Sequence, residues 1–284
     1  MQSPASQNPA GYDAGFLAVP VPLPTAKREL RPLGYTHFTV LLDAARRLAA
    51  VTAVNIDATS LVELERGDDW HLDPRVPEDE QAGPELYRAN DLDRGHLVRR
   101  RDPVWGSPAV AARANTDTFA YTNAAPQAAE FNQSRELWLG LEDYLLGYAD
   151  ETGQRLSVFT GPVLADRDPV YRGVGIPQAF WKIAAWTIPG PDGPTLAATA
   201  YLLDQSPQLD DIDLSEARRE ALATDAPPPL GPYRTFQVPV RDIEAATGLD
   251  VGPLVAADRL EVVQGVLPPS TGWIPLAAYG DIRL

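Results

Sequence analysis

The sequence predicts an α+β fold, with a central and mostly antiparallel β-sheet flanked by helices in a single domain. Several short runs are rich in β-branched and aromatic residues, which is typical of strands, and few segments have helical periodicity. Hydrophobic residues make up 44% of the chain, which also has six Trp, so it can fill a core. The sequence has no evident internal repeat and no clear second domain.

The first element is an extended N-terminal arm over residues 1–33. This segment is rich in Pro, Gly and Ala, with Val-Pro-Val-Pro-Leu-Pro at residues 19–24. Proline fixes φ and has no backbone N–H, so the segment can form neither a regular helix nor a central strand. We therefore place the folded domain at residues 34–284.

Two strands are expected next, at residues 35–42 and 50–56, where β-branched and aromatic residues are frequent. Residues 43–47 form the turn or short helix between them. Residues 68–90 are polar and contain prolines, so we expect a surface loop there. A short strand is expected at residues 119–123.

A helix is expected at residues 134–149, because apolar residues recur there at helical spacing, and Gly153 is a suitable stop. The periodic residues are Leu137, Trp138, Leu141, Leu145 and Tyr148. Later strands are expected at residues 156–160, 180–188 and 197–203. A short helix at residues 242–247 ends at Gly248, a residue type that favours the left-handed cap.

The formal net charge is −15 at pH 7, which opposes binding to nucleic acid, because affinity for phosphates comes largely from basic side chains. A local basic cleft can nevertheless exist within an acidic protein. Lys27 and Lys182 are the only lysines, so almost all positive charge is Arg. This bias either serves bidentate phosphate binding or, as we favour, reflects the Arg and Pro codons of a GC-rich genome.

The chain has no cysteine, which excludes a disulfide framework and a thiolate metal site. It also lacks an apolar run of the roughly 18 residues that a membrane span needs. The N-terminus has neither the basic nor the apolar region of a signal peptide. We therefore expect a cytoplasmic protein without membrane contact, while secretion by another route stays open.

The three histidines differ in their surroundings. His37 lies in the first expected strand, where a structural role is favoured, and His71 lies in the polar loop, where a solvated side chain is the default. His96 ends the tetrapeptide Asp93-Arg94-Gly95-His96. Glycine permits close approach to a phosphate or a sharp turn, and arginine can bind phosphate with two hydrogen bonds. An imidazole with an ordinary pKa of about 6.5 can act as a general base at neutral pH.

Three further motifs follow the tetrapeptide in order. They are Thr122-Asn123-Ala-Ala-Pro126-Gln127, Phe131-Asn132-Gln133 and Trp138-Leu-Gly-Leu141-Glu142. This series resembles the DNA/RNA non-specific endonucleases of the ββα-metal fold, a family that includes endonuclease G and secreted bacterial nucleases. The likeness covers about residues 33–270, with further matches at Arg66, Thr160-Gly161-Pro162, residues 176–182 and residues 238–248.

The resemblance implies that residues 34–284 form one endonuclease domain, which hydrolyses phosphodiester bonds of DNA and RNA with little sequence specificity and leaves 5′-phosphate ends. It implies that His96 is the general base. It also implies that Asn132 is the one protein ligand of a divalent cation, either Mg²⁺ or an alternative such as Mn²⁺. Magnesium often keeps several waters, so one amide ligand can suffice.

Other roles follow from the same resemblance. Glu142 would orient water on the metal, Asp93 and Asn123 would brace the site, and Arg66 and Arg94 would bind phosphate. Arg99 begins the run Arg99-Arg100-Arg101, which either lines the substrate cleft or is a solvated basic turn; we include Arg99 among the phosphate-binding candidates. The segment Trp181–Trp186 is interpreted as core rather than as a platform for nucleobases.

The sequence departs from the family pattern in two places. Ten positions separate Asn132 from Glu142, two more than in most relatives. On a continuous helix two residues rotate a side chain by about 200°, so we place the insertion in the turn before the helix, near Ser134 or Arg135. The alternative is that Glu142 is only a surface residue. Leu146 stands where relatives often have an arginine, so one phosphate contact is missing or comes from elsewhere.

Two alternative functions stay open. One is a phosphodiesterase of the same fold with a narrow substrate range, and the other is a catalytically silent nucleic-acid-binding module. The intact Asp93, Arg94, His96 and Asn132 argue against the second. A non-specific nuclease inside its host would be dangerous, so an inhibitor or regulatory partner is a hypothesis, as is a homodimer.

Overall fold

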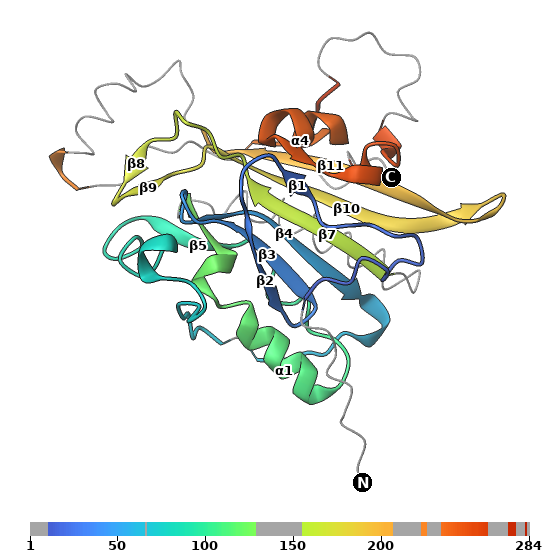
Figure 1. Cartoon of the computed structure of the whole chain (residues 1–284), viewed down its shortest axis with the longest axis horizontal. Helices are drawn as coiled ribbons and strands as arrows, with labels where there is room; N and C mark the ends of the chain where they lie inside the picture. Colours follow the sequence, from blue (N-terminus) through green and yellow to red (C-terminus); the bar gives the residue numbers. More distant parts are fainter. Residues whose placement is uncertain are drawn as a thin grey trace.

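The computed structural model describes residues 11–65, 67–128, 155–206, 223–225, 234–260, 272–276 and 282. Its main element is an eight-stranded sheet with the order β14-β12-β11-β10-β7-β4-β3-β2, and each neighbouring pair is antiparallel (Figure 1). The expected antiparallel sheet is therefore confirmed. Its strands are β2 (Arg31–Tyr35), β3 (Phe38–Asp43), β4 (Leu48–Asp57), β7 (Arg155–Pro162), β10 (Ala179–Gly190), β11 (Gly193–Asp204), β12 (Arg234–Val238) and β14 (Ile274–Pro275).

Strands predicted from apolar runs match β4, β7, β10 and β11, but the first predicted strand is interrupted. Thr36 and His37 form the turn between β2 and β3, and His37 has a positive φ of 65°. The prediction of an unbroken strand at residues 35–42 is wrong at this point, because His37 is in the left-handed region that strands do not use.

Both faces of the sheet are covered. Along β10, Trp181 and Ile183 pack into the cluster on one face, whereas Phe180 and Ala184 pack into the cluster on the other. Successive strand residues point to opposite faces, so a strand buried on both sides is a continuous apolar run instead of an alternating one. Trp181 and Trp186 are buried, which confirms that this segment belongs to the core.

Helix α4 (Val240–Thr247) covers one face of the sheet, where Val240 and Ile243 pack with the cluster that contains Trp181 (Figure 1). It ends at Gly248, whose φ is 67° and whose N–H donates to Glu244 O, as the sequence predicts. Thus the predicted helix at residues 242–247 is confirmed.

Among the described residues, the opposite face is covered mainly by irregular chain instead of a helix. Leu97, Val98, Ala120 and Ala125 pack into the cluster on that face. Helix α1 (Pro108–Asp117) lies on the same side, but its buried residues pack against Val104, Val62 and Leu64. The helix expected at residues 134–149, on which the ββα-metal arrangement depends, lies outside the described residues.

The described part of the N-terminal arm, residues 11–30, lies against the α4 side of the sheet. Leu17 and Val21 are buried there, and β1 (Thr25–Ala26) pairs with β13 (Leu249–Asp250). The arm is thus extended but packed against the domain.

The remaining elements are short. They are β5 (Leu92–His96), β6 (Ala124–Ala128), β8 (Val170–Tyr171), β9 (Val174–Gly175) and the 3-10 turns Ala58–Ser60, Glu78–Glu80, Tyr121–Asn123 and Gly252–Leu254. The strand expected at residues 119–123 is instead the 3-10 turn before β6. Within the described residues, no helix combines the length and the apolar character that crossing a membrane requires.

Candidate active site

The tetrapeptide that ends at His96 forms most of strand β5, which pairs antiparallel with β6. Asp93 lies opposite Gln127, and His96 lies opposite Ala124. The backbone N–H of Leu97 continues the pairing by donating to Asn123 O at 2.9 Å. This β5–β6 ribbon therefore brings two of the sequence motifs side by side.

Gly95 is required because the Gln127 side chain lies directly against its Cα. A Cβ at Gly95 would lie 2.1 Å from Cδ of Gln127, whose side chain is buried against the glycine. Gly95 is within a strand and is not among the glycines with positive φ, so of the two possibilities left open by the sequence, a sharp turn does not apply here. The glycine is explained by the neighbouring Gln127 side chain.

Arg94 and His96 point to the same face of β5, because side chains two residues apart on a strand share a face. Trp70 lies beside both of them. Its ring centroid is 4.6 Å from that of His96, and the Arg94 guanidinium carbon lies 5.3 Å from the indole centroid. His96 is half-buried and its Nε2 atom is buried, whereas the Arg94 side chain is 37% exposed, so the guanidinium is the more accessible of the two groups.

Trp70 belongs to an aromatic cluster that we define as Trp70, Tyr87, Phe119 and Tyr121. The Trp70 ring meets Phe119 edge-on at 5.5 Å and Tyr121 at 5.6 Å, and Tyr121 stacks on Tyr87 at 6.0 Å. Phe119 also contacts His96 edge-on at 5.2 Å. The His96 imidazole is therefore held on two sides by aromatic rings.

Asn123 fixes the chain that follows His96. Its side-chain oxygen accepts from the N–H of Val98 at 2.8 Å. Its amide nitrogen donates to Val98 O at 3.0 Å and to Thr118 O at 2.9 Å. The side chain is fully buried, so these bonds satisfy it inside the protein and make it a bracing residue in geometry.

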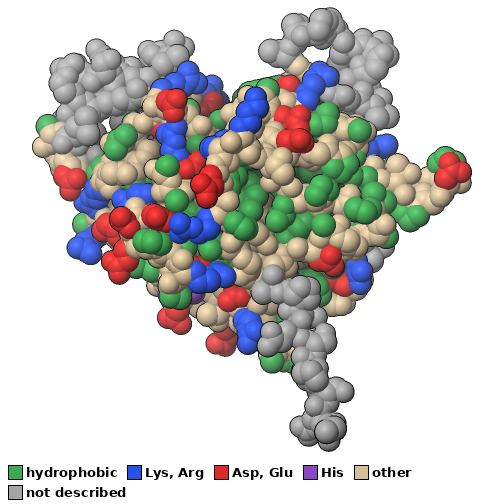
Figure 2. All heavy atoms as spheres, viewed as in Figure 1, with side chains coloured by type: hydrophobic (Ala, Val, Ile, Leu, Met, Phe, Trp, Pro, Cys, Tyr) green, Lys and Arg blue, Asp and Glu red, His purple; other side chains and the backbone are tan. Residues whose placement is uncertain are grey.

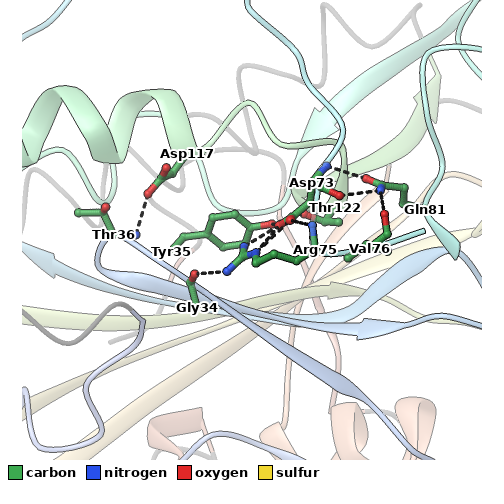
Figure 3. A network of polar contacts seen from close by, with 9 residues as sticks. All are labelled: Gly34, Tyr35, Thr36, Asp73, Arg75, Val76, Gln81, Asp117 and Thr122. Carbon is green, nitrogen blue, oxygen red and sulfur yellow. Dashed lines mark hydrogen bonds and ion pairs between the residues drawn. The ribbon is translucent and has the colours of Figure 1, made fainter. Parts of the chain in front are cut away.

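A buried polar network leads to Thr122, the residue before Asn123 (Figure 3). The Tyr35 hydroxyl donates a short hydrogen bond to the carboxylate of Asp73 and lies 2.6 Å from the Thr122 hydroxyl. Arg75 donates to both oxygens of Asp73 and to Gly34 O, the latter at 2.9 Å. Its guanidinium lies over the Tyr35 ring. The network joins the edge strand β2 to the start of β6.

Burial alone would raise the pKa of Asp73, but hydrogen bonds from Arg75 and Tyr35 outweigh it and lower the pKa from 3.8 to about 2. The carboxylate is therefore ionised at neutral pH and accepts the single hydroxyl hydrogen of Tyr35. Burial and this bond to Asp73 raise the pKa of Tyr35. Thr122 must then be the donor in its bond to Tyr35.

The three arginines after the tetrapeptide have different surroundings. Arg100 donates to Leu64 O and to Asn115 Oδ1, each at 3.1 Å, and Arg101 lies 3.8 Å from Glu63 Oε1. These contacts tie the turn to α1 and to the segment before it. Arg99 is half-buried. Its role in phosphate binding stays a prediction.

The other two histidines lie elsewhere. His37 stacks on Trp105 at 3.4 Å, and its Nδ1 lies 2.8 Å from Pro103 O. Burial lowers the pKa of His37, and the hydrogen bond to Pro103 partly opposes this. His71 is half-buried in the loop, with Nδ1 3.1 Å from Asp69 O, and its backbone positions Trp70.

Of the predicted site residues, the structure places Asp93, Arg94, His96 and Asn123 on or next to the β5–β6 ribbon, with Asp93 on the opposite face of β5 from Arg94 and His96. Arg66, Asn132 and Glu142 lie outside the described residues. Among the described residues, no group of three or more His, Asp or Glu could hold a metal ion.

Trp70 is the site residue that the sequence did not reveal. It lies in a polar loop, and it reaches His96 because His71 exchanges backbone hydrogen bonds with Phe119 and Tyr121. A bulky aromatic residue in an otherwise polar loop was the one available signal.

Basic and acidic side chains are interspersed on the face shown in Figure 2. Several arginines of the protein are paired, as Arg46 with Asp166, Arg47 with Glu85 and Arg172 with Asp225. Such pairing places carboxylates beside several of the arginines that could attract phosphate.

The chain is similar to known nucleases over most of its length. Residues 18–258 match the model of the DNA/RNA non-specific endonuclease family. The uncharacterized protein y4fB of Sinorhizobium fredii is 42% identical over 290 residues, which span 92% of this chain and 41% of that protein. Bovine mitochondrial endonuclease G is 28% identical over 201 residues, spanning 66% of this chain and 57% of that protein. The chain thus covers less than two thirds of the length of both relatives.

Two further similarities are more distant. Mitochondrial nuclease 1 of Schizosaccharomyces pombe is 25% identical over 253 residues, 83% of this chain and 69% of that protein. The solved structure of an EndoG/EndoGI complex includes a chain with a TM-score of 0.54 and 19% identity. The match covers 77% of this chain and 84% of that chain, and at this identity it shows similarity of fold alone.

Proposed function

Because the chain belongs to the DNA/RNA non-specific endonuclease family, we propose that it is an endonuclease that hydrolyses phosphodiester bonds of DNA and RNA with little sequence specificity. The observation that supports this most directly is the placement of Arg94 and His96 on one face of β5, with Trp70 against both. The two side chains to which we assign phosphate binding and proton transfer are thus neighbours on one face of the strand.

In the proposed reaction, the neutral imidazole of His96 accepts a proton from the water that attacks phosphorus. Proton transfer to a positioned base lowers the barrier without changing substrate affinity. Arg94 binds a phosphate oxygen, and its guanidinium can do so with two hydrogen bonds. Arg66 and Arg99 supply further phosphate contacts, and Asp93 and Asn123 brace the ribbon.

Low sequence specificity follows from these contacts. Bonds to phosphate oxygens fix the position of a nucleic acid but carry no information about its bases. The proposed groups, Arg94 and His96, both act on the phosphodiester. We propose that the products have 5′-phosphate ends.

We further propose that Asn132 holds a divalent cation, Mg²⁺ in the first instance, with Glu142 beside it. When bound, such a cation stabilises the charge that develops on the phosphate and on the leaving oxygen. Calorimetric titration of Mg²⁺ into wild type and Asn132→Ala tests the assignment. Weaker binding in the variant is expected, and equal affinity would place the metal elsewhere.

A plasmid-nicking assay tests the function. Wild-type protein with Mg²⁺ should convert supercoiled plasmid to nicked and linear forms and should degrade RNA, and excess EDTA should stop both. Cleavage of a small phosphodiester without cleavage of either polymer would instead support the narrow-substrate alternative. EndoG is inhibited in the structurally similar EndoG/EndoGI complex; for this chain, an inhibitor or regulatory partner is likewise a proposal.

A further inference from the structure

Trp70 contacts both of the side chains to which we assign the chemistry, although it belongs to none of the motifs. We propose that Trp70 is a positioning residue that holds the His96 imidazole and the Arg94 guanidinium in their working arrangement. This proposal rests on the proposed function. Its physical basis is that Trp70 is fixed independently of β5 and lies across the side chains of two β5 residues.

The geometry of the strand explains why such a residue is needed. Two side chains on the same face of a strand start about 7 Å apart, and each can rotate about its own bonds. The Trp70 indole contacts both, with a ring-centroid distance of 4.6 Å to His96 and 5.3 Å to the Arg94 guanidinium carbon. One rigid ring therefore restricts both rotations.

Trp70 itself is held from outside the ribbon. The N–H of His71 donates to Phe119 O at 3.1 Å, and the N–H of Tyr121 donates to His71 O at 2.9 Å. The indole meets the rings of Phe119 at 81° and Tyr121 at 41°. These contacts anchor the loop on the residues between α1 and β6.

The contact with Arg94 has a second consequence. Arg94 lies 3.7 Å from Asp68, whose side chain is 74% exposed, so this ion pair is weak and easily exchanged. A phosphate can therefore take the place of Asp68 beside Arg94. A guanidinium is attracted to an aromatic face, so the indole keeps Arg94 in place while its partner changes.

A different role for an aromatic residue near a nuclease site is to stack on a nucleobase. Stacking needs a free ring face. The Trp70 ring already contacts His96, Arg94, Phe119 and Tyr121, so positioning is favoured over stacking. Position matters because a misplacement of about 1 Å can lower a rate about 100-fold.

The test compares Trp70→Leu and Trp70→Phe with a matched control, Trp105→Leu. Trp105 is also half-buried and also stacks on a histidine, His37, but it has no contact with the ribbon among its ring contacts in the described residues. Circular dichroism and thermal denaturation select variants that are folded at the assay temperature. Proton NMR then follows the imidazole signals, which are few because the chain has three histidines.

In folded Trp70→Leu we expect the His96 imidazole signal to lose its indole ring-current shift, and kcat to fall about 10- to 100-fold. Trp70→Phe keeps an aromatic face and should retain more activity. In Trp105→Leu the signal of His37 should move, while the His96 signal and kcat stay as in wild type.

The proposal is overturned if folded Trp70→Leu keeps both the wild-type His96 signal and the wild-type kcat. It is also overturned if KM rises while kcat is unchanged, since that result identifies a substrate-stacking residue. A fall in kcat without movement of the His96 signal would exclude an effect through His96. Failure of the proposed function can be distinguished from failure of the Trp70 proposal. In the first case wild type lacks nuclease activity, whereas the NMR comparison of the variants needs no activity.

Discussion

The hydroxyl groups of Tyr35 and Thr122 lie 2.6 Å apart, although 87 positions separate the two residues in the chain. Tyr35 gives its only hydroxyl hydrogen to Asp73, so Thr122 donates to Tyr35. The order of donors thus runs from the start of β6 toward a buried carboxylate. This relationship links the stability of β2 to the placement of the β5–β6 ribbon.

Tyr35→Phe should lower the free energy of unfolding by about 1.5–3 kcal/mol, the range for hydrogen bonds to charged groups. Tyr12→Phe is the matched control, because the Tyr12 hydroxyl donates to the neutral Val21 O, at 2.9 Å. Its loss should cost about 1 kcal/mol. Urea denaturation of both variants measures the difference, and equal losses would mean that Asp73 adds nothing to the Tyr35 bond.

Asp73 should make the protein sensitive to acid between about pH 4 and pH 2. Its pKa is lowered in the fold to about 2 from 3.8, so its contribution is complete above the unfolded value and is lost as pH falls through the folded value. The shift corresponds to roughly 2 kcal/mol. Asp73→Asn should be less stable at pH 7 but should lose less stability on acidification.

The control for Asp73 is Asp166→Asn, because Asp166 is fully exposed beside Arg46 and such pairs contribute little. Denaturant titrations at pH 7, 4 and 3 provide the comparison. If wild type and Asp73→Asn lose stability in parallel from pH 4 downward, Asp73 is not the group responsible.

His96→Ala should lower the rate of plasmid cleavage by about 10²- to 10⁴-fold, the usual contribution of a general base, while DNA binding persists. His71→Ala is the control, because His71 follows Trp70 directly in the chain, yet its ring nitrogen Nδ1 lies 3.1 Å from Asp69 O within the loop. Its rate should stay close to that of wild type. A His96→Ala protein with more than roughly a tenth of the wild-type rate would refute the assignment.

Gly95→Ala should destabilise the ribbon by about 1–3 kcal/mol, the typical cost of overpacking, because its Cβ would meet the Gln127 side chain. Combining it with Gln127→Ala removes the atoms in conflict and should recover most of that loss. Thermal denaturation of the two single variants and the double variant measures the coupling. Additive effects in the double variant would show that Gln127 does not restrict residue 95.

Binding to duplex DNA should depend only weakly on salt. The slope of log K against log salt is about −0.9 per phosphate contact, and we expect roughly two to four contacts, chiefly through Arg66, Arg94 and Arg99. Arg100 and Arg101 are engaged with α1 and Glu63, which supports a small number. A salt series with His96→Ala protein gives the slope, and a value near roughly −8 would indicate a broad basic track.

Runs of apolar, β-branched and aromatic residues were sufficient to predict the central strands, but the ribbon that carries the site could not be predicted. Strands β4, β7, β10 and β11 are continuous apolar runs because both faces of the sheet are covered. Strand β5 consists of Leu-Asp-Arg-Gly-His, which has no strand-like composition. It is extended because β6, which lies well beyond it in the sequence, supplies its backbone partners.

Helix α1 was missed for a related reason. Ser107 caps its N-terminus by accepting from Val110 N–H, and Pro108 follows at the first position, both of which are start signals. Only Ala111 and Ala114 are buried, so the helix has little apolar periodicity to detect. Trp70 was missed because backbone bonds between His71 and residues 119–121, distant in sequence, decide where it points.

The network around Asp73 also determines how β2 ends the sheet. β2 is an outermost strand, and such edges can recruit a strand from another molecule. Pro32 has no backbone N–H, and Arg75 donates a hydrogen bond to the carbonyl of Gly34. The N–H of Thr36 donates to Asp117 at 2.9 Å. Arg75 therefore both binds Asp73 and covers part of this edge, so loss of the Asp73 charge would weaken the protection against intermolecular β-pairing as well as the fold.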